Sequence, residues 1–474
     1  MDNINNINNI NNIKDKCGVF ALYDNKNIYK NLINGLSLLQ HRGQESAGIS
    51  YIENREFKTY KKNGFVKDIF YDIDKKIDIN CCIGHVRYST QKKTSKNNML
   101  KESHPIEGKL KFKNKSINNT FSLAHNGNIP NINKFKEYYN ILDKDLDLEI
   151  NSDTYIVVKI IEKLSEKYDN MNDILINIIN KIHGAYSFVI LFNNEIYAMR
   201  DVYGIKPLCI GKNKDGGYCI SSESIALQNY KLIRDVKAGE IVKIDKKLLF
   251  KTIYKRNISK TLFCSFEYIY FMKNDSINNN KKIKHLRYQL GFELGLKEKN
   301  IIRSAVVLSI PNTAIKSAKG FANAVNLEYN DYITKKTGTI RTFILPTNDE
   351  RINACNNKFN FSPLLKDLNI YIIDDSIVRG NTLKSIVKQL KDIGVRQIHL
   401  RITAPPVISE CYLGIDIPTK NELIAHNKTI ENIKNEFYVN SLKYIDIKNM
   451  KKIFDENICT SCFDNKYNKK LIDW

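Results

Sequence analysis

A chain of 474 residues is longer than one hydrophobic core usually organises, so two or three domains are expected. Its hydrophobic content of 42% excludes a disordered protein, and the absence of any run of about eighteen apolar residues argues against a membrane-spanning helix. The formal charge of +23 comes from lysines spread along the chain without a concentrated basic block, so we expect a solvated basic surface and no nucleic-acid partner.

Residues 1–16 form an Asn-Ile repeat. This segment lacks the apolar stretch of a secretory signal and the Arg- and Ser-rich pattern of a transit peptide. Export is therefore not expected, and the cytoplasm is the expected compartment. In that compartment the ten cysteines indicate chemistry or metal binding and not disulfides.

The residues that follow, up to about 250, are rich in predicted strands. The pattern predicts a helix over 153–163 and strands at 17–23, 185–191 and 195–199. Beyond about 262, strands and helices alternate, which implies a parallel sheet. The strands are predicted at 301–310, 368–373 and 397–403, the helices at 313–325 and 382–393, and a helical tail follows. We therefore predict domains at 17–250 and 262–474.

Cys17 is the first residue with candidate chemistry. A thiol needs a base to become a thiolate near neutral pH. That base could be a histidine, and His41, His85, His104 and His125 are candidates. It could instead be the α-amino group of Cys17 itself, if residues 1–16 were removed, because such an amine has a pKa of about 8. An isolated Cys-Gly is more commonly a buried strand cysteine.

Three further motifs favour chemistry at Cys17. Gln40 to Gly48 is a helix end that runs into a glycine turn. The motif from Gly84 to Thr90 is expected to follow a strand, and its Arg87 could bind a carboxylate ligand. Asn126 presents an amide beside the N–H group of Gly127, which is a possible oxyanion hole. Asp153 then places a carboxylate at a predicted helix start.

These motifs, in this order, resemble the class II glutamine amidotransferase domain. The resemblance implies the N-terminal-nucleophile fold, a four-layer αββα sandwich, with Cys17 as the nucleophile that forms a glutamyl thioester. It implies that Arg87 binds the α-carboxylate of glutamine and Asp153 its α-amino group. It also implies that Asn126 and Gly127 stabilise the oxyanion, and that residues 1–16 are a propeptide.

The second chemical centre follows the predicted strand at 368–373. Asp374 to Thr382 is a turn that leads into a helix, and its N–H groups could hold a phosphate. Asp374 and Asp375 suit ribose hydroxyls and Mg²⁺. A bare Asp-Asp at a strand end is often only a helix cap, but the full nine-residue string is far rarer.

That string resembles the phosphoribosyl pyrophosphate loop of type I phosphoribosyltransferases, in the form found in amidophosphoribosyltransferases. Matching segments at 266–271, 286–291, 341–344 and 404–406 extend the resemblance over residues 17–474. It implies a parallel-sheet α/β second domain and one Mg²⁺ per subunit, bound by Thr313, Asp374 and Asp375. The phosphoribosyl pyrophosphate ligands that it implies are Asp374, Asp375, Ser376, Val378, Arg379, Gly380, Asn381, Thr382, Arg287, Lys335 and Arg341.

The same resemblance implies the reaction. Ammonia released from glutamine would cross an apolar tunnel and displace pyrophosphate from phosphoribosyl pyrophosphate. The product would be 5-phosphoribosylamine, at the first step of purine synthesis. Feedback inhibition by purine nucleotides and a homodimer or homotetramer are also implied.

Four cysteines form the third centre. Cys459-x-x-Cys462 alone fits zinc, redox or iron–sulfur chemistry. Cys264 and Cys411 stand where one branch of the resembled family has the other two ligands of a [4Fe–4S] cluster. The resemblance therefore implies this cluster, with zinc as the physical alternative.

Three positions depart from the family pattern. Asn312 replaces an aspartate beside Thr313, Asn381 replaces a threonine, and the loop at 335–340 lacks its usual tyrosine and one arginine. Two alternatives follow: a glutaminase whose transferase half has decayed, or a non-catalytic regulator that binds phosphoribosyl pyrophosphate or nucleotides. The full set of glutaminase motifs favours the enzyme.

Overall fold

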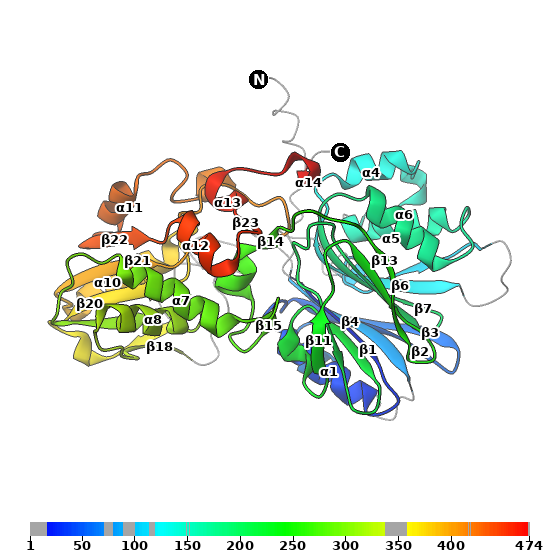
Figure 1. The fold of residues 1–474 in the computed structure, drawn as a ribbon, viewed down its shortest axis with the longest axis horizontal. Coiled ribbons are helices and arrows are strands. Elements are labelled where there is room, and N and C mark those ends of the chain that lie inside the picture. Colours follow the sequence, from blue (N-terminus) through cyan, green and yellow to red (C-terminus); the bar gives the residue numbers. More distant parts are fainter. Residues whose placement is uncertain are drawn as a thin grey trace, which may run out of the picture.

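The computed structural model describes residues 17–70, 79–88, 100–112, 119–147, 149–150, 152–336, 358–415, 417 and 419–472. The predicted propeptide 1–16, the predicted ligand Arg341 and residues 337–340 of the altered loop lie outside these ranges. Figure 1 shows two bodies side by side, one built on two large sheets and the other on a parallel sheet flanked by helices.

Two antiparallel sheets make up the first body. In spatial order the first contains β11 (Lys231–Asp235), β9 (Cys209–Lys212), β10 (Tyr218–Ser221), β1 (Gly18–Tyr23), β4 (Cys81–Arg87), β2 (Ser46–Glu53) and β3 (Glu56–Asn63). The second contains β13 (Phe250–Lys255), β12 (Glu240–Ile244), β8 (Glu195–Arg200), β7 (Ala185–Phe192), β6 (Thr120–Asn128) and β5 (Ile106–Lys109).

The two sheets pack face to face, because alternate residues of their strands are apolar and need cover. Val19, Ala124 and Val189 belong to the core between them. Helices α1 (Ile28–Leu39) and α2 (Val66–Ile69) cover the outer face of the first sheet. The outer face of the second is covered by α4 (Ile132–Tyr138), α5 (Asp153–Leu164) and α6 (Met171–Lys181). The predicted αββα sandwich is confirmed.

A four-stranded parallel sheet organises the second body, in the order β17 (Ala305–Ser309), β20 (Asn369–Asp374), β21 (Gln397–Ile402) and β22 (Ser441–Tyr444). Its central strands read as continuous apolar runs because both faces are covered. Helices α7 (Ile283–Leu296) and α8 (Ile315–Val325) pack on one face. On the other face lie α10 (Asn381–Ile393) and α11 (Ile430–Phe437). The predicted parallel-sheet α/β fold is confirmed.

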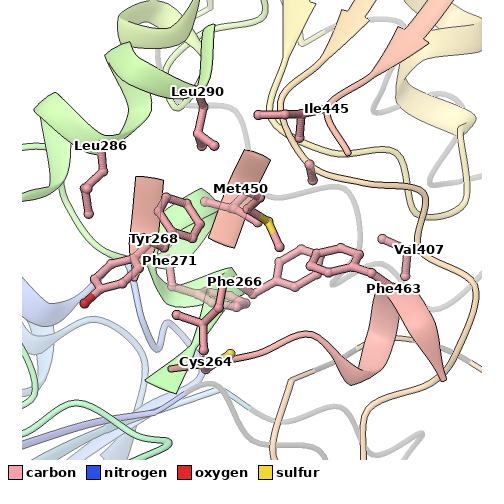
Figure 2. Close-up of a cluster of buried hydrophobic side chains, with 14 of the residues drawn as sticks. Cys264, Phe266, Tyr268, Phe271, Leu286, Leu290, Val407, Ile445, Met450 and Phe463 are labelled. Atoms are coloured by element: carbon pink, nitrogen blue, oxygen red, sulfur yellow. The ribbon is translucent and has the colours of Figure 1, made fainter. Parts of the chain in front are cut away.

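The C-terminal segment connects the two bodies. It contains α12 (Ile447–Phe454), β23 (Ile458–Cys459), α13 (Ser461–Asp464) and α14 (Lys469–Ile472). Strand β23 pairs with β14 (Phe263–Cys264), and Phe266 stacks on Phe463 with ring centroids 5.4 Å apart. Figure 2 shows these aromatic rings with Met450 and Tyr268 in one core. Short strand pairs β15 (Ile277–Asn278) with β16 (Lys281–Lys282) and β18 (Ile333–Lys335) with β19 (Phe359–Phe361) complete the sheets.

Two local predictions were wrong. The segment after β21 was expected to be helical, but it also supplies β22, the edge strand of the parallel sheet. The motif that contains Arg87 was expected to follow a strand, but Gly84 to Arg87 is the end of β4 itself. No helix among the described residues is long and apolar enough to cross a membrane.

Candidate functional site

Cys17 lies immediately before β1 and is fully buried. Its carbonyl oxygen accepts a hydrogen bond of 2.9 Å from Nε of Arg42. In the pairing of β1 with β4, Gly18 stands opposite Val86, so Cys17 and Arg87 are next in line at the same end of the sheet. The strand register thereby brings the predicted nucleophile to the predicted carboxylate-binding residue.

The predicted oxyanion residues lie at the end of β6 in the facing sheet. The amide of Asn126 donates a 3.4 Å hydrogen bond to Oγ of Ser222, and the same Oγ accepts a 2.9 Å bond from the backbone N–H of Val19. Ser222 therefore joins the strand of Cys17 to that of Asn126. Beside it, Gly127 has no room for a side chain, because an added Cβ would stand 1.9 Å from the carbonyl oxygen of Ala185.

The two predicted glutamine ligands both have partners inside the protein. Arg87 forms a buried 2.8 Å ion pair with Glu102. Asp153 is the first residue of α5 and accepts a 3.0 Å hydrogen bond from the backbone N–H of Ile129. Burial raises the pKa of Asp153, but His125 and the hydrogen bonds from Ile129 and Thr154 lower it more. The carboxylate therefore stays ionised.

Three of the histidines considered as bases form a buried cluster. The ring of His104 lies 3.1 Å from that of His85, whose Nε2 bonds to the carbonyl oxygen of His125. Burial lowers the pKa of His85 to about 3 and that of His104 well below its usual value. Those two rings are too weakly basic to deprotonate a thiol near neutral pH. Of the other two candidates, His125 bonds through Nδ1 to the Thr154 hydroxyl at 2.9 Å. His41 has its ring nitrogens at Glu223 and at the carbonyl oxygen of Leu38.

A cavity of about 520 Å³ lies at the carboxyl end of the parallel sheet. Helix α10 begins at its edge, so the N–H groups of its first turn can bind phosphate. Every described residue that was predicted to bind phosphoribosyl pyrophosphate or Mg²⁺ lines it: Arg287, Thr313, Lys335, Asp374, Asp375, Ser376, Val378, Arg379, Gly380, Asn381 and Thr382.

Adjacent carboxyl groups set the electrostatics of this cavity. Burial and the neighbouring Asp375 raise the pKa of Asp374 well above its usual value. Burial also raises the pKa of Asp375, whereas hydrogen bonds from Ser376 and Thr313 lower it. Two carboxylates this close favour a bound cation or proton, and their oxygens with the Thr313 hydroxyl suit Mg²⁺.

Arg287 lines the cavity, but its guanidinium is already engaged. It donates to the carbonyl oxygens of Tyr268 and Met272 and to Oδ1 of Asn274, at 2.9, 2.8 and 2.9 Å. Burial lowers its pKa to about 10. Arg287 therefore shapes the 268–274 wall of the cavity. Another predicted ligand, Arg379, forms an ion pair with Glu422 at 2.8 Å.

The first body supplies part of the cavity wall, since His41 and Gln44 line it. Between them in sequence, Arg42 is buried and donates to Glu223 at 2.6 Å and to both oxygens of Glu267 at 2.6 and 2.9 Å. Glu267 belongs to the second body, and Glu223 in turn accepts from the backbone N–H of Lys273. One guanidinium thus contacts the Cys17 backbone, Glu223 of the first body and Glu267 of the second body.

The four cysteines expected to bind a cluster meet at one place. Cys264, Cys411, Cys459 and Cys462 line a cavity of about 20 Å³ between the bodies. Burial raises the pKa of all four thiols, and neighbouring cysteines raise it further at Cys264, Cys411 and Cys462. In the described part of the chain, no group of three or more His, Cys, Asp or Glu side chains is arranged as a finished metal site. The four cysteines therefore line one small cavity, but their sulfur atoms are not arranged around a common metal position.

Comparisons with known proteins match both bodies. The model of a glutamine amidotransferase domain matches residues 111–229. An amidophosphoribosyltransferase of Pyrococcus horikoshii is 35% identical over 97% of this chain and 98% of its own length. That of Methanothermobacter thermautotrophicus is 32% identical over 96% of this chain and 94% of its own.

Solved structures give the same result. The glutamine phosphoribosylpyrophosphate amidotransferase of B. subtilis, complexed with ADP and GMP, superimposes with a TM-score of 0.83 at 29% identity, covering 95% of this chain and 97% of that one. A structure described as the allosteric regulatory enzyme of purine biosynthesis gives a TM-score of 0.84 at 28% identity, with coverage of 95% and 96%.

The fold and the paired sites define a glutamine amidotransferase joined to a phosphoribosyltransferase. With relatives of at least 30% identity along nearly its whole length, the chain belongs to the amidophosphoribosyltransferase family. It is a glutamine-dependent enzyme of the first step of purine biosynthesis.

Sequence reasoning missed several residues that complete these sites. Ser222, Glu102 and Glu223 lie in no motif that was singled out, and nothing local distinguishes them. Arg42 lies in the motif at 40–48 and Glu267 in the segment at 266–271, but their ion pair joins positions 225 residues apart, which the sequence does not reveal. The Lys358 side chain also lines the phosphate cavity and was not predicted.

Proposed function

We propose that Cys17 and the phosphate cavity catalyse two consecutive half-reactions. The Cys17 thiolate attacks the side-chain amide of glutamine, ammonia leaves, and water then hydrolyses the thioester to glutamate. Arg87 binds the α-carboxylate and Asp153 the α-amino group of glutamine. Asn126 and Gly127 stabilise the oxyanion of the tetrahedral intermediate. The observation that carries the proposal is that His41 and Gln44, close to Cys17 in the fold, also line the phosphate cavity.

The α-amino group of Cys17 is the base in this proposal. It becomes available when residues 1–16 are removed as a propeptide. The low pKa of the buried His85 and His104 rings supports this choice over a histidine base. So do the bonded nitrogens of His41 and the bond of the buried His125 to Thr154. Arg42 fixes the Cys17 carbonyl and so orients the residue that carries both nucleophile and base.

In the second half-reaction ammonia attacks C1 of phosphoribosyl pyrophosphate, the C1–O bond breaks, and pyrophosphate leaves. The proposed substrate ligands are the loop 374–382, Lys335 and Arg341, with Arg287 acting on the cavity wall. Thr313, Asp374 and Asp375 hold one Mg²⁺ per subunit, which neutralises charge on the leaving pyrophosphate when bound. An apolar path between the sites keeps ammonia unprotonated.

The four converging cysteines are proposed to hold a [4Fe–4S] cluster, with zinc as the alternative. Burial and the three neighbouring cysteines raise the pKa of Cys462, so a free thiolate is unfavourable there, and a cationic centre removes that cost. Iron, sulfide and zinc analysis of anaerobically purified protein distinguishes the two. Cys459→Ser should abolish retention of whichever is present, whereas Cys355→Ser should not.

The remaining proposals concern organisation and regulation. Residues 17–250 are the glutaminase domain and 262–474 the phosphoribosyltransferase domain. Purine nucleotides are proposed as feedback inhibitors, by analogy with the B. subtilis structure complexed with ADP and GMP. A homodimer or homotetramer in the cytoplasm is the proposed assembly.

The coupled reaction is tested by following glutamate and pyrophosphate together, with glutamine, Mg²⁺ and phosphoribosyl pyrophosphate supplied. Matched amounts support the proposal. Glutamate without pyrophosphate would favour the second candidate, a glutaminase with a decayed transferase half, which the altered 335–340 loop and Asn312 suggest.

The nucleophile has its own test. Cys17→Ala should lose glutamine use and keep the reaction with added ammonium salts. Cys219→Ala, another buried strand cysteine, is the matched control. Equal use of glutamine by the Cys17 variant would refute the assignment. Intact mass should show a mature chain that begins at Cys17, and a fully active uncleaved chain would rule out the α-amino base.

A further inference from the structure

Lys206 is among the most completely buried long side chains of the protein, with 1% of its surface exposed. It lies in the first body, directly after Ile205, whose carbonyl oxygen accepts a 3.2 Å hydrogen bond from the N–H group of Cys264. Its ammonium group crosses to the second body and donates a 2.8 Å hydrogen bond to the carbonyl oxygen of Gly414. Among the ion pairs of the described residues, none includes Lys206. It also lies near the cysteine cluster, because its charge acts to lower the pKa of three thiols there, those of Cys264, Cys411 and Cys459.

The Gly414 backbone packs directly on the oxyanion strand. A Cβ atom added to Gly414 would stand 3.0 Å from the carbonyl carbon of Gly127 and 3.2 Å from the nitrogen of Asn128. Two residues earlier in the same loop, the carbonyl oxygen of Tyr412 accepts a 2.7 Å hydrogen bond from the side-chain amide of Asn128. The 411–415 loop of the second body therefore lies against the residues proposed to stabilise the oxyanion.

The energetics argue against an incidental contact. A buried ammonium loses most of its hydration, and a single carbonyl recovers only part of that loss. Gly414 has φ of +86°, a conformation that side chains rarely adopt, so glycine is favoured at this contact. A buried ammonium that donates to the carbonyl of a glycine packed against the oxyanion strand is suited to hold that strand in place.

We propose that Lys206 is a positioning residue for the glutaminase oxyanion site. It holds the carbonyl of Gly414, and Gly414 in turn keeps the backbone of Gly127 in place. The proposal rests on the proposed role of Gly127 in glutamine cleavage. It makes the oxyanion site depend on a loop of the phosphoribosyltransferase body, so glutamine cleavage requires the two bodies to be docked.

The test replaces the charge and keeps the volume. Lys206→Met should lower kcat with glutamine by about tenfold to a hundredfold, since misplacement of about 1 Å costs about that much. The KM for glutamine should change less than about twofold, because Arg87 and Asp153 are untouched, and the reaction with ammonium salts should be preserved. Lys206→Arg should recover most of the loss.

Matched controls separate positioning from general destabilisation. Lys281 also donates to a carbonyl oxygen, that of Phe454 at 3.0 Å, away from both sites, so Lys281→Met should leave both reactions unchanged. Gly414→Ala acts from the other side of the contact, and should lower glutamine-dependent kcat similarly. The double variant Lys206→Met/Gly414→Ala should be no worse than either single one, because both remove the same contact.

Equal loss of the glutamine and ammonium reactions in Lys206→Met would overturn the proposal, as would additive effects in the double variant or no effect at all. If Lys206→Met fails to fold, Lys206→Gln, which keeps a polar side chain but removes the charge, takes its place in the same comparison of the glutamine and ammonium reactions. A failure of the glutaminase proposal looks different, because Cys17→Ala would then retain glutamine use.

Discussion

Replacing Arg42 by Met removes the guanidinium that forms ion pairs with two buried carboxylates, those of Glu223 and Glu267. The Arg42 side chain is 3% exposed, and those of Glu223 and Glu267 are 0% and 1% exposed. Burial lowers the pKa of Arg42, but Glu267 and Glu223 raise it by more than burial lowers it. The guanidinium is therefore charged at any accessible pH. The substitution leaves Glu267 without its bidentate partner and Glu223 with His41 and Ser276 as its remaining side-chain partners.

The magnitude follows from that arrangement. Breaking a buried ion pair by removing one partner costs about 3–5 kcal/mol, and here one removal affects two carboxylates, so the upper end is expected. Because Arg42 also holds the Cys17 carbonyl, glutamine-dependent activity should fall further than ammonium-dependent activity. The double variant Arg42→Met/Glu267→Gln removes the negative charge that Arg42→Met leaves unpaired at Glu267. It should therefore recover part of the lost free energy of unfolding.

Chemical unfolding followed by fluorescence measures the stability, and parallel assays with glutamine and ammonium salts measure the two activities. Lys101→Met is the matched control, since Lys101 also serves two carboxylates, Asp147 at 3.0 Å and Glu149 at 2.6 Å, but its side chain is 42% exposed and theirs are 39% and 62% exposed. It should cost much less, because exposed ion pairs contribute little to stability. Equal losses for Arg42→Met and Lys101→Met would refute the reasoning from burial.

Three further predictions follow from single contacts. Gly127→Ala should lower glutamine-dependent kcat by about a hundredfold or more while sparing the ammonium reaction, because the new Cβ meets the Ala185 carbonyl at 1.9 Å; equal loss of both reactions would contradict this. Asp374→Asn should abolish pyrophosphate release but not glutamate release, and unchanged pyrophosphate release would remove Asp374 from the site. Acid should destabilise the junction of the two bodies. Burial raises the pKa of Glu223, but His41 and Arg42 lower it more, so the folded protein holds Glu223 ionised to a lower pH than the unfolded chain does. The stability that the Glu223 carboxylate contributes is therefore present above its ordinary pKa of 4.5 and is lost as pH falls towards the pKa in the folded protein. Glu223→Gln should flatten the acid limb of a melting-temperature profile, and an unchanged limb would refute the assignment.

Local sequence was sufficient for the elements and for most single site residues. The ends of helix α10 and strand β20 were predicted within one or two residues. The signals used are local ones: the apolar periodicity of each element, and Gly394, which ends the helix in a left-handed conformation. The same locality explains why Asp374 and Asp375 were found, since the phosphate loop is one continuous string between a strand and a helix.

Tertiary structure alone decided how the sites meet. Arg42 and Glu223 are 181 positions apart, and Lys206 and Gly414 are 208 apart, so no periodicity or spacing could pair them. Strand β22 was missed for a related reason: four residues carry too little periodicity, and its place at the sheet edge depends on β21 beside it. Propensity and motif act over a few residues, whereas buried charges choose their partners by desolvation in the folded state.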